Sequence, residues 1–234
     1  MARPSFNEYP NWCANSNDRG GTAPSLWIIH TEEGGSVKDG AQSLSDFLIS
    51  TTGGPNPVSY HYTISQDPVD HGVTVVDCVD TDLSSWSVGA GNDRAINLCF
   101  AGSTVNWSTS EWMQQSRAID VAAYLAVQDC TKYGIPLRTM APPYTHFSAK
   151  SWGITDHQFV TNVIGWGTHV DCGPNFPWPF FGARIRYWQT QLAPPIHATK
   201  TTDAASLYSS VKDVQKRLTD IEAKIAAITT KLGA

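Results

Sequence analysis

Several sequence patterns that define large protein classes are missing from this chain. Its five cysteines (Cys13, Cys78, Cys99, Cys130 and Cys172) form no C-x-x-C pair, and an odd number fits neither a disulfide framework nor a zinc finger. We therefore expect buried free thiols. The motif H-E-x-x-H is also missing, which excludes the common helix-borne site of zinc peptidases.

Long apolar runs and excess positive charge are missing too. No apolar stretch approaches the roughly 18 residues that a membrane span needs, so we expect none. The first residues, MARPSFNEYPNW, lack the apolar core of a signal peptide, which predicts a protein made in a cytoplasm. The formal net charge of −5 argues against a nucleic-acid partner but leaves carbohydrate or peptide substrates open.

The length, the composition and the apolar patterns of the chain indicate one α/β domain followed by a shorter C-terminal segment. The 234 residues are 41% hydrophobic and include nine tryptophans, enough for a sizeable core. Short β-branched runs predict strands, and apolar residues at helical spacing predict helices. We expect a mixed central β-sheet flanked by helices. The predicted strands are 25–30, 58–65, 73–79 and 95–100, and the predicted helices are 39–50, 108–133 and 182–192.

Two boundaries have specific signals. Ser108 and Glu111 have the spacing of a capping box, and Gly134 with Pro136 ends the same long helix. Residues 140–180 are rich in glycine, proline and aromatics, which predicts mainly loops.

The C-terminal residues differ in kind from the rest. We expect a domain at 1–196, a polar linker at 197–205 and a coiled-coil helix at 206–234 that forms a homo-oligomer. Isoleucine at two d positions favours three or four strands over two, and the alternative is a helix that packs on its own domain. The heptad positions are Leu207, Val211, Val214, Leu218, Ile221, Ile225, Ile228 and Leu232.

Three residues of zinc-ligand type are spread along the domain. His30 ends a predicted strand, His157 follows a predicted turn, and Asp171 lies in the segment HVDCGPNFPW. Two imidazoles and one carboxylate leave a fourth zinc position open, which is typical of a catalytic site. A zinc ion with an open position can promote hydrolysis of an amide.

The order of the segments WIIHTEEGG, SYHYTIS, WSVGAGNDRAINLCFAG, ITDHQ and HVDCGPNFPW adds to this. Together they resemble the N-acetylmuramoyl-L-alanine amidase family, which includes phage lysozyme-type amidases and peptidoglycan-recognition proteins. The resemblance covers about residues 20–192 and is strongest to phage endolysins. It implies a zinc enzyme that cleaves the bond between N-acetylmuramic acid and L-alanine in peptidoglycan, with the metal in a surface groove.

The resemblance assigns the zinc ligands by position. His30, His157 and Asp171 match the three ligands of the family. Cys172 and His169 compete for the third place, since members carry Asp or Cys there and His169 lies two residues before Asp171.

The resemblance also implies roles beside the metal. Tyr60 and His169 match residues that stabilise the oxyanion of the transition state. Where some members carry a glutamate base, this chain has Cys99. Glu32 and Glu33, which come just after His30, are other carboxylates that could contribute.

Substrate contacts are predicted from loops that would line the groove. Trp86, Asn92 and Trp166 occupy these loops. His61 follows Tyr60, so in a strand it would point to the opposite face of the sheet and serve structure alone. The main competing hypothesis is a non-catalytic peptidoglycan-binding module. Such relatives usually lose a zinc ligand, so the presence of all three favours the enzyme.

Overall fold

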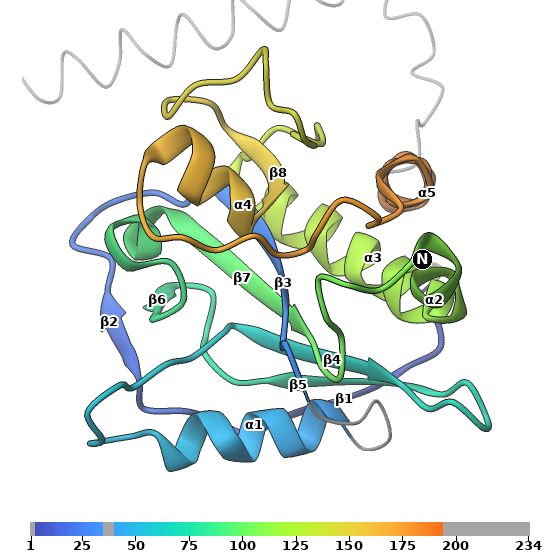
Figure 1. Ribbon diagram of the computed structural model, residues 1–234, viewed down its shortest axis with the longest axis horizontal. Coiled ribbons are helices and arrows are strands. Elements are labelled where there is room, and N and C mark those ends of the chain that lie inside the picture. Colours follow the sequence, from blue (N-terminus) through green and yellow to red (C-terminus); the bar gives the residue numbers. More distant parts are fainter. Residues whose placement is uncertain (1–2, 35–39, 194–234) are drawn as a thin grey trace, which may run out of the picture. The chain divides into compact units, whose positions relative to one another are not determined.

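The computed structural model describes residues 3–34 and 40–193, and a six-stranded sheet lies at its centre (Figure 1). The strand order is β1-β5-β4-β7-β3-β8, and all neighbours are parallel except the antiparallel pair β4 and β5. This mixed sheet confirms the predicted fold class. The strands of this sheet are β1 (Asn7–Pro10), β3 (Leu26–Thr31), β4 (Tyr62–Gln66), β5 (Val73–Asp77), β7 (Ala95–Phe100) and β8 (Gly153–Asp156).

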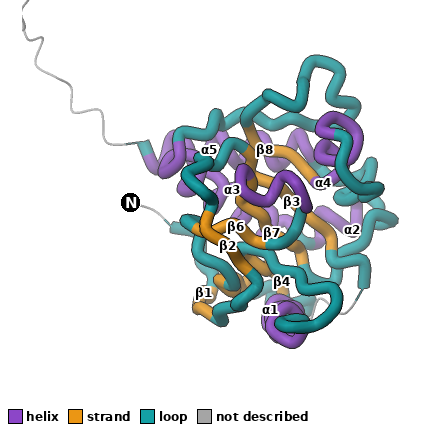
Figure 2. The backbone as a smooth tube through the Cα atoms, turned by 90° about the vertical axis from the view of Figure 1, so that its left-hand side faces the viewer, coloured by secondary structure: helices purple, strands orange, loops and turns teal. Residues whose placement is uncertain are grey.

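Helices cover both faces of the sheet. Helix α1 (Gly40–Ser50) contacts β4 and β5 from one side, while α3 (Ser116–Tyr133) and α5 (Trp178–Leu192) pack together on the other. In Figures 1 and 2 the strands lie between α1 and these two helices. Every residue of β3 is buried, as expected for a parallel strand with both faces covered.

The alternation of β3 decides which side carries the candidate site. Trp27 and Ile29 enter the main core with α3 and α5, where Phe181 stacks on Trp27. Ile28 and His30 therefore point to the opposite face, the one that α1 partly covers. The candidate ligand His30 is thus kept out of the main apolar core.

The predicted helix 108–133 is interrupted at Gln115. Its capping box at Ser108 and Glu111 is present, and Gly134 ends it in the left-handed conformation. The break gives α2 (Thr109–Gln114) and α3, because the Gln66 side chain enters between them. Gln66 Nε2 donates to the Gln114 carbonyl at 2.7 Å, and Gln66 Oε1 accepts from the backbone N–H of Arg117 at 3.0 Å.

Three further boundaries were wrong. Residues 140–180 contain β8, followed by α4 (His157–Phe159) and a π-helical turn at Val160–Ile164. Strand β4 begins only at Tyr62, because the backbone N–H of Ser59 and His61 pairs with the carbonyls of Trp86 and Asn97 in other segments. Helix α5 begins at Trp178, four residues before the predicted start.

The short elements β1, β2 (Ser16–Asp18) and β6 (Leu83–Ser85) were not predicted, nor was the 3-10 helix at Gly89–Arg94. Strands β2 and β6 pair with each other in a separate antiparallel ribbon. All five cysteines lie within the described residues, and each is buried and unpaired, as predicted. In the same residues no helix combines the length and apolarity of a membrane span. The predicted linker and coiled coil lie outside the described residues.

Candidate metal centre

Parallel pairing brings two of the candidate ligands together. Strands β3 and β8 are parallel neighbours with Ile29 opposite Asp156, so His30 and His157 follow at the same edge of the sheet. His157 is thus the first residue after a strand and begins α4; it does not follow a turn as predicted. Asp171 comes from the loop before α5, and its carbonyl accepts from the backbone N–H of Gln158 at 2.9 Å.

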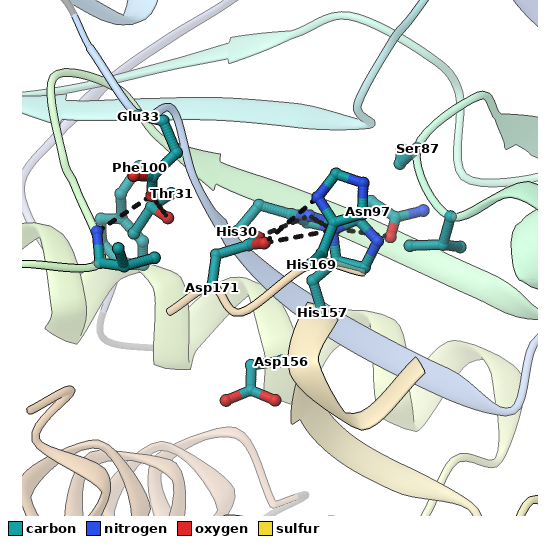
Figure 3. A network of polar contacts seen from close by, with 12 residues as sticks. His30, Thr31, Glu33, Ser87, Asn97, Phe100, Asp156, His157, His169 and Asp171 are labelled. Carbon is teal, nitrogen blue, oxygen red and sulfur yellow. Dashed lines mark hydrogen bonds and ion pairs between the residues drawn. The ribbon is translucent and has the colours of Figure 1, made fainter. Parts of the chain in front are cut away.

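The side chains of these three residues point toward one another (Figure 3). The Nδ1 atoms of His30 and His157 lie 3.1 Å apart, and the Asp171 carboxylate lies 3.3 Å from the first and 3.4 Å from the second. A tetrahedral zinc with bonds of 2.0–2.1 Å has ligand atoms roughly 3.3–3.4 Å apart. The three donor atoms therefore already have the spacing that such an ion requires.

The Asp171 carboxylate stays ionised in this setting. Burial by itself would raise its pKa, but the neighbouring imidazoles of His157 and His30 bring that pKa well below its ordinary value. Burial lowers the pKa of His157, which leaves its imidazole neutral at neutral pH. One carboxylate with two imidazoles is a donor set that zinc commonly takes.

Asp156, the residue before His157, caps the short helix that begins at His157. Its Oδ1 accepts from the Phe159 backbone N–H at 3.2 Å and from the Tyr144 hydroxyl, so it caps the start of α4. Burial raises the pKa of Asp156 to about 7. This buried cap fixes the point at which the chain turns from β8 into His157.

The two competitors for the third ligand position lie differently. Cys172 is fully buried and packs in the main hydrophobic core. The His169 ring stacks on His157 with centroids 3.9 Å apart, and its Nδ1 is 3.7 Å from the Asp171 carboxylate. Among the described residues, the metal-competent group consists of His30, His157 and Asp171.

Tyr60 and His169 flank the three ligands. The Tyr60 ring centroid is 4.9 Å from that of His30. Burial, then the proximity of Cys99 and of the Asp171 carboxylate, raises the pKa of Tyr60 well above its ordinary value, so its hydroxyl keeps its proton. Burial and the neighbouring His157 lower the pKa of His169, whose side chain is 59% exposed and reachable from solvent.

A cleft of about 240 Å³ opens over these groups. Trp86, a predicted substrate contact, is among the residues that line it. Asn92 does not line it, since its Oδ1 accepts from the backbone N–H of Ser87 and Val88 and so shapes the loop. Trp166 is 51% exposed and lies against Gly89, outside the lining. The lining residues are Thr31, Glu32, Glu33, Val58, Tyr60, Trp86, Ser87, His157, His169 and Asp171.

The carboxylates at the cleft mouth are held by backbone. Glu32 accepts from the N–H of Gly102, and Glu33 accepts from that of Val105 at 3.0 Å. They join the end of β3 to the loop after β7. Cys99 lies behind them, fully buried, and burial raises the pKa of its thiol well above the ordinary value. A neutral buried thiol cannot replace a glutamate base.

Reasoning from the sequence missed the groups behind His30. His30 Nε2 lies 2.9 Å from Asn97 Oδ1, and Asn97 is linked through Ser85 to His61. His61 was expected to lie within a strand and to point away from the site. Strand β4 begins only at the next residue, Tyr62, so the alternation of a strand does not apply to His61. A polar residue in the otherwise apolar strand AINLCF was the signal that could have drawn attention to Asn97.

Comparison with known proteins agrees with this geometry. The N-acetylmuramoyl-L-alanine amidase family (Amidase_2) matches residues 20–174, more than half of the chain. The chain belongs to this family, as its motifs predicted. Comparison with proteins of curated function gave no match.

Solved structures of similar fold include bacterial and animal proteins. The hydrolase AmiA of Staphylococcus aureus, in complex with its ligand, has a TM-score of 0.58 and 15% identity over 81% of this chain and 88% of that chain. A mutant endolysin from Bacillus subtilis has a TM-score of 0.49 and 16% identity over 77% and 99%. The amidase LysC of Clostridium intestinale has a TM-score of 0.48 and 14% identity over 79% and 99%. The similarity to AmiA shows a shared fold.

Proposed function

We propose that this protein is a zinc-dependent N-acetylmuramoyl-L-alanine amidase that degrades peptidoglycan as a phage endolysin. The observation that carries this proposal is the group His30, His157 and Asp171, whose donor atoms lie 3.1–3.4 Å apart beside an open cleft in a chain of the amidase family. A protein of this kind is made in the host cytoplasm and acts on the cell wall after release.

The proposed chemistry divides between the metal and the chain. Zinc, when bound by His30, His157 and Asp171, would polarise the scissile carbonyl and acidify a water molecule. Tyr60 keeps its proton and donates a hydrogen bond to the oxygen that gains negative charge. His169 is neutral and partly exposed, so it can donate to the same oxygen or exchange a proton with solvent. Trp86 and Ser87 also line the cleft, where the glycan or peptide would lie.

The test uses purified peptidoglycan and a soluble muramoyl peptide. We expect new L-alanine amino termini without new reducing ends, loss of this activity after dialysis against a chelator, and its recovery with one equivalent of zinc. New reducing ends would instead indicate a glycosidase. Tight wall binding without any product would indicate a recognition module, the second candidate, which the replacement of a glutamate base by buried Cys99 favours.

Trp166 provides a prediction about the proposed cleft. A Cβ at Gly89 would lie 1.7 Å from Trp166 Nε1, so Gly89→Ala must displace the indole. If Trp166 contacts substrate, the KM for a muramoyl peptide should rise roughly threefold to tenfold, as expected for one aromatic contact. The control is Gly20→Ala, which has a similar φ of +58° but nothing within 4 Å of the added Cβ. Equal KM values in both variants would remove Trp166 from the substrate contacts.

The proposed domain division assigns 1–196 to catalysis, 197–205 to a linker and 206–234 to an oligomerising coiled coil. Several linked catalytic domains would bind a polymeric wall with avidity even when each domain binds weakly. We expect truncation after residue 196 to leave cleavage of soluble muramoyl peptide unchanged and to weaken lysis of whole walls. The mass of the full chain and of the truncated chain in solution gives the oligomer number. Equal lysis by both would contradict this role.

A further inference from the structure

A row of hydrogen bonds runs from His30 through buried side chains to Ser87, which lines the cleft. His30 Nε2 is 2.9 Å from Asn97 Oδ1, and Asn97 Nδ2 donates to Ser85 Oγ at 3.0 Å. All three side chains are fully buried. None of them contacts solvent, so each hydrogen in the row must be given to a partner within it.

The direction of the row is fixed at its far end. Ser87 Oγ donates to the carbonyl of Ser59, which can only accept. Ser87 has then used its hydrogen and can only accept from Ser85 Oγ, 2.9 Å away. Ser85 in turn accepts from Asn97 Nδ2, which turns Asn97 Oδ1 toward His30.

His61 imposes the same direction. Its Nδ1 accepts from the Asn97 backbone N–H at 2.9 Å and lies 3.0 Å from Ser85 Oγ, while its Nε2 donates to the Leu83 carbonyl at 3.0 Å. Burial lowers the pKa of His61 to about 3, so the ring stays neutral. His61 Nδ1 therefore has no hydrogen to give to Ser85.

We propose that Asn97 is a positioning residue that holds His30 as the Nε2–H tautomer and so directs the Nδ1 lone pair toward zinc. An amide oxygen cannot donate, so the hydrogen between Asn97 and His30 must be on Nε2. The lone pair of Nδ1 then faces Asp171 and His157, 3.3 and 3.1 Å away. This inference rests on the proposed zinc function. Loss of such a partner of a ligand typically weakens metal binding about 10- to 100-fold.

The first measurement needs no variant. In the metal-free wild-type protein, the imidazole ¹⁵N shifts of His30 should show a protonated Nε2. An unprotonated Nε2 would overturn the proposal. This result is independent of whether the protein cleaves peptidoglycan.

The second measurement is the zinc dissociation constant of three variants. Asn97→Leu should raise it about 10- to 100-fold. Asn97→Asp keeps an acceptor for His30 and should bind zinc no more weakly than the wild type. The matched control is Thr63→Val on the adjacent strand, which also removes a buried hydrogen bond, from Thr63 Oγ1 to the Ala41 carbonyl, and should leave zinc affinity unchanged.

Each outcome is decisive. Equal affinities of Asn97→Leu and the wild type would overturn the proposal, and so would equal losses in Asn97→Leu and Thr63→Val, which would indicate general destabilisation. Should Asn97→Leu not fold, the ¹⁵N shifts of the wild type still decide. Failure of the wild type itself to bind zinc would contradict the proposed metal site, while the tautomer would still show whether Asn97 orients His30.

Discussion

Replacement of Asp171 by alanine is expected to abolish zinc binding and to reduce amidase activity on the order of a thousandfold or more. The carboxylate is the only anionic member of the three-residue group, and its removal leaves only two imidazoles to hold a dication. Loss of the metal removes several kcal/mol of transition-state stabilisation, and each 1.36 kcal/mol corresponds to a tenfold change in rate. The measurements are zinc per chain by elemental analysis and release of L-alanine amino termini from peptidoglycan.

The control for Asp171→Ala is Asp93→Ala, which removes an exposed carboxylate from the 3-10 helix and should keep both zinc and activity. Zinc retained by Asp171→Ala would transfer the third-ligand role to a neighbour. His169 is already 3.7 Å from the Asp171 carboxylate, whereas Cys172 would have to leave the hydrophobic core. The double variants with His169→Ala and Cys172→Ala would identify which of the two substitutes.

Phe181→Ala is expected to lower the free energy of unfolding by about 3–5 kcal/mol, the cost of truncating a fully buried phenylalanine. Phe181 is fully buried at the centre of the aromatic cluster that joins α5 to the sheet. Its ring contacts that of Trp27 in β3, that of Phe176 just before α5, and that of Trp178 at the start of α5. The measurement is denaturant-induced unfolding followed by circular dichroism.

Tyr187→Ala on the same helix is the matched control. Tyr187 is 41% exposed, and its ring packs against Arg184 and Trp188 at the surface. We expect its replacement to cost less than about 1 kcal/mol. Similar losses for both variants would mean that the aromatic cluster does not hold α5 to the sheet as its packing indicates.

Much of the fold was predictable where the signal was local. The apolar run Ala95–Phe100 was predicted with its observed bounds, and the capping box at Ser108 and the helix end at Gly134 are set by neighbouring residues. The break between α2 and α3 was not predictable, because it depends on Gln66 reaching in from a strand 48 residues earlier. Strand β8 was missed for a similar reason: four residues give too little pattern, and pairing with β3 makes them a strand.

The candidate site also combines features set by the local sequence with features set by long-range contacts. The order of the five motifs indicated the amidase family, and the residue types of His30, His157 and Asp171 indicated the expected metal, because donor chemistry and motif order belong to the chain itself. Only the tertiary structure placed these residues within 3.4 Å of one another, moved Trp166 and Asn92 out of the cleft lining, and connected His30 to Asn97. The physical reason is that hydrogen-bond direction and donor spacing depend on strand pairing across more than a hundred residues, which no local sequence pattern encodes.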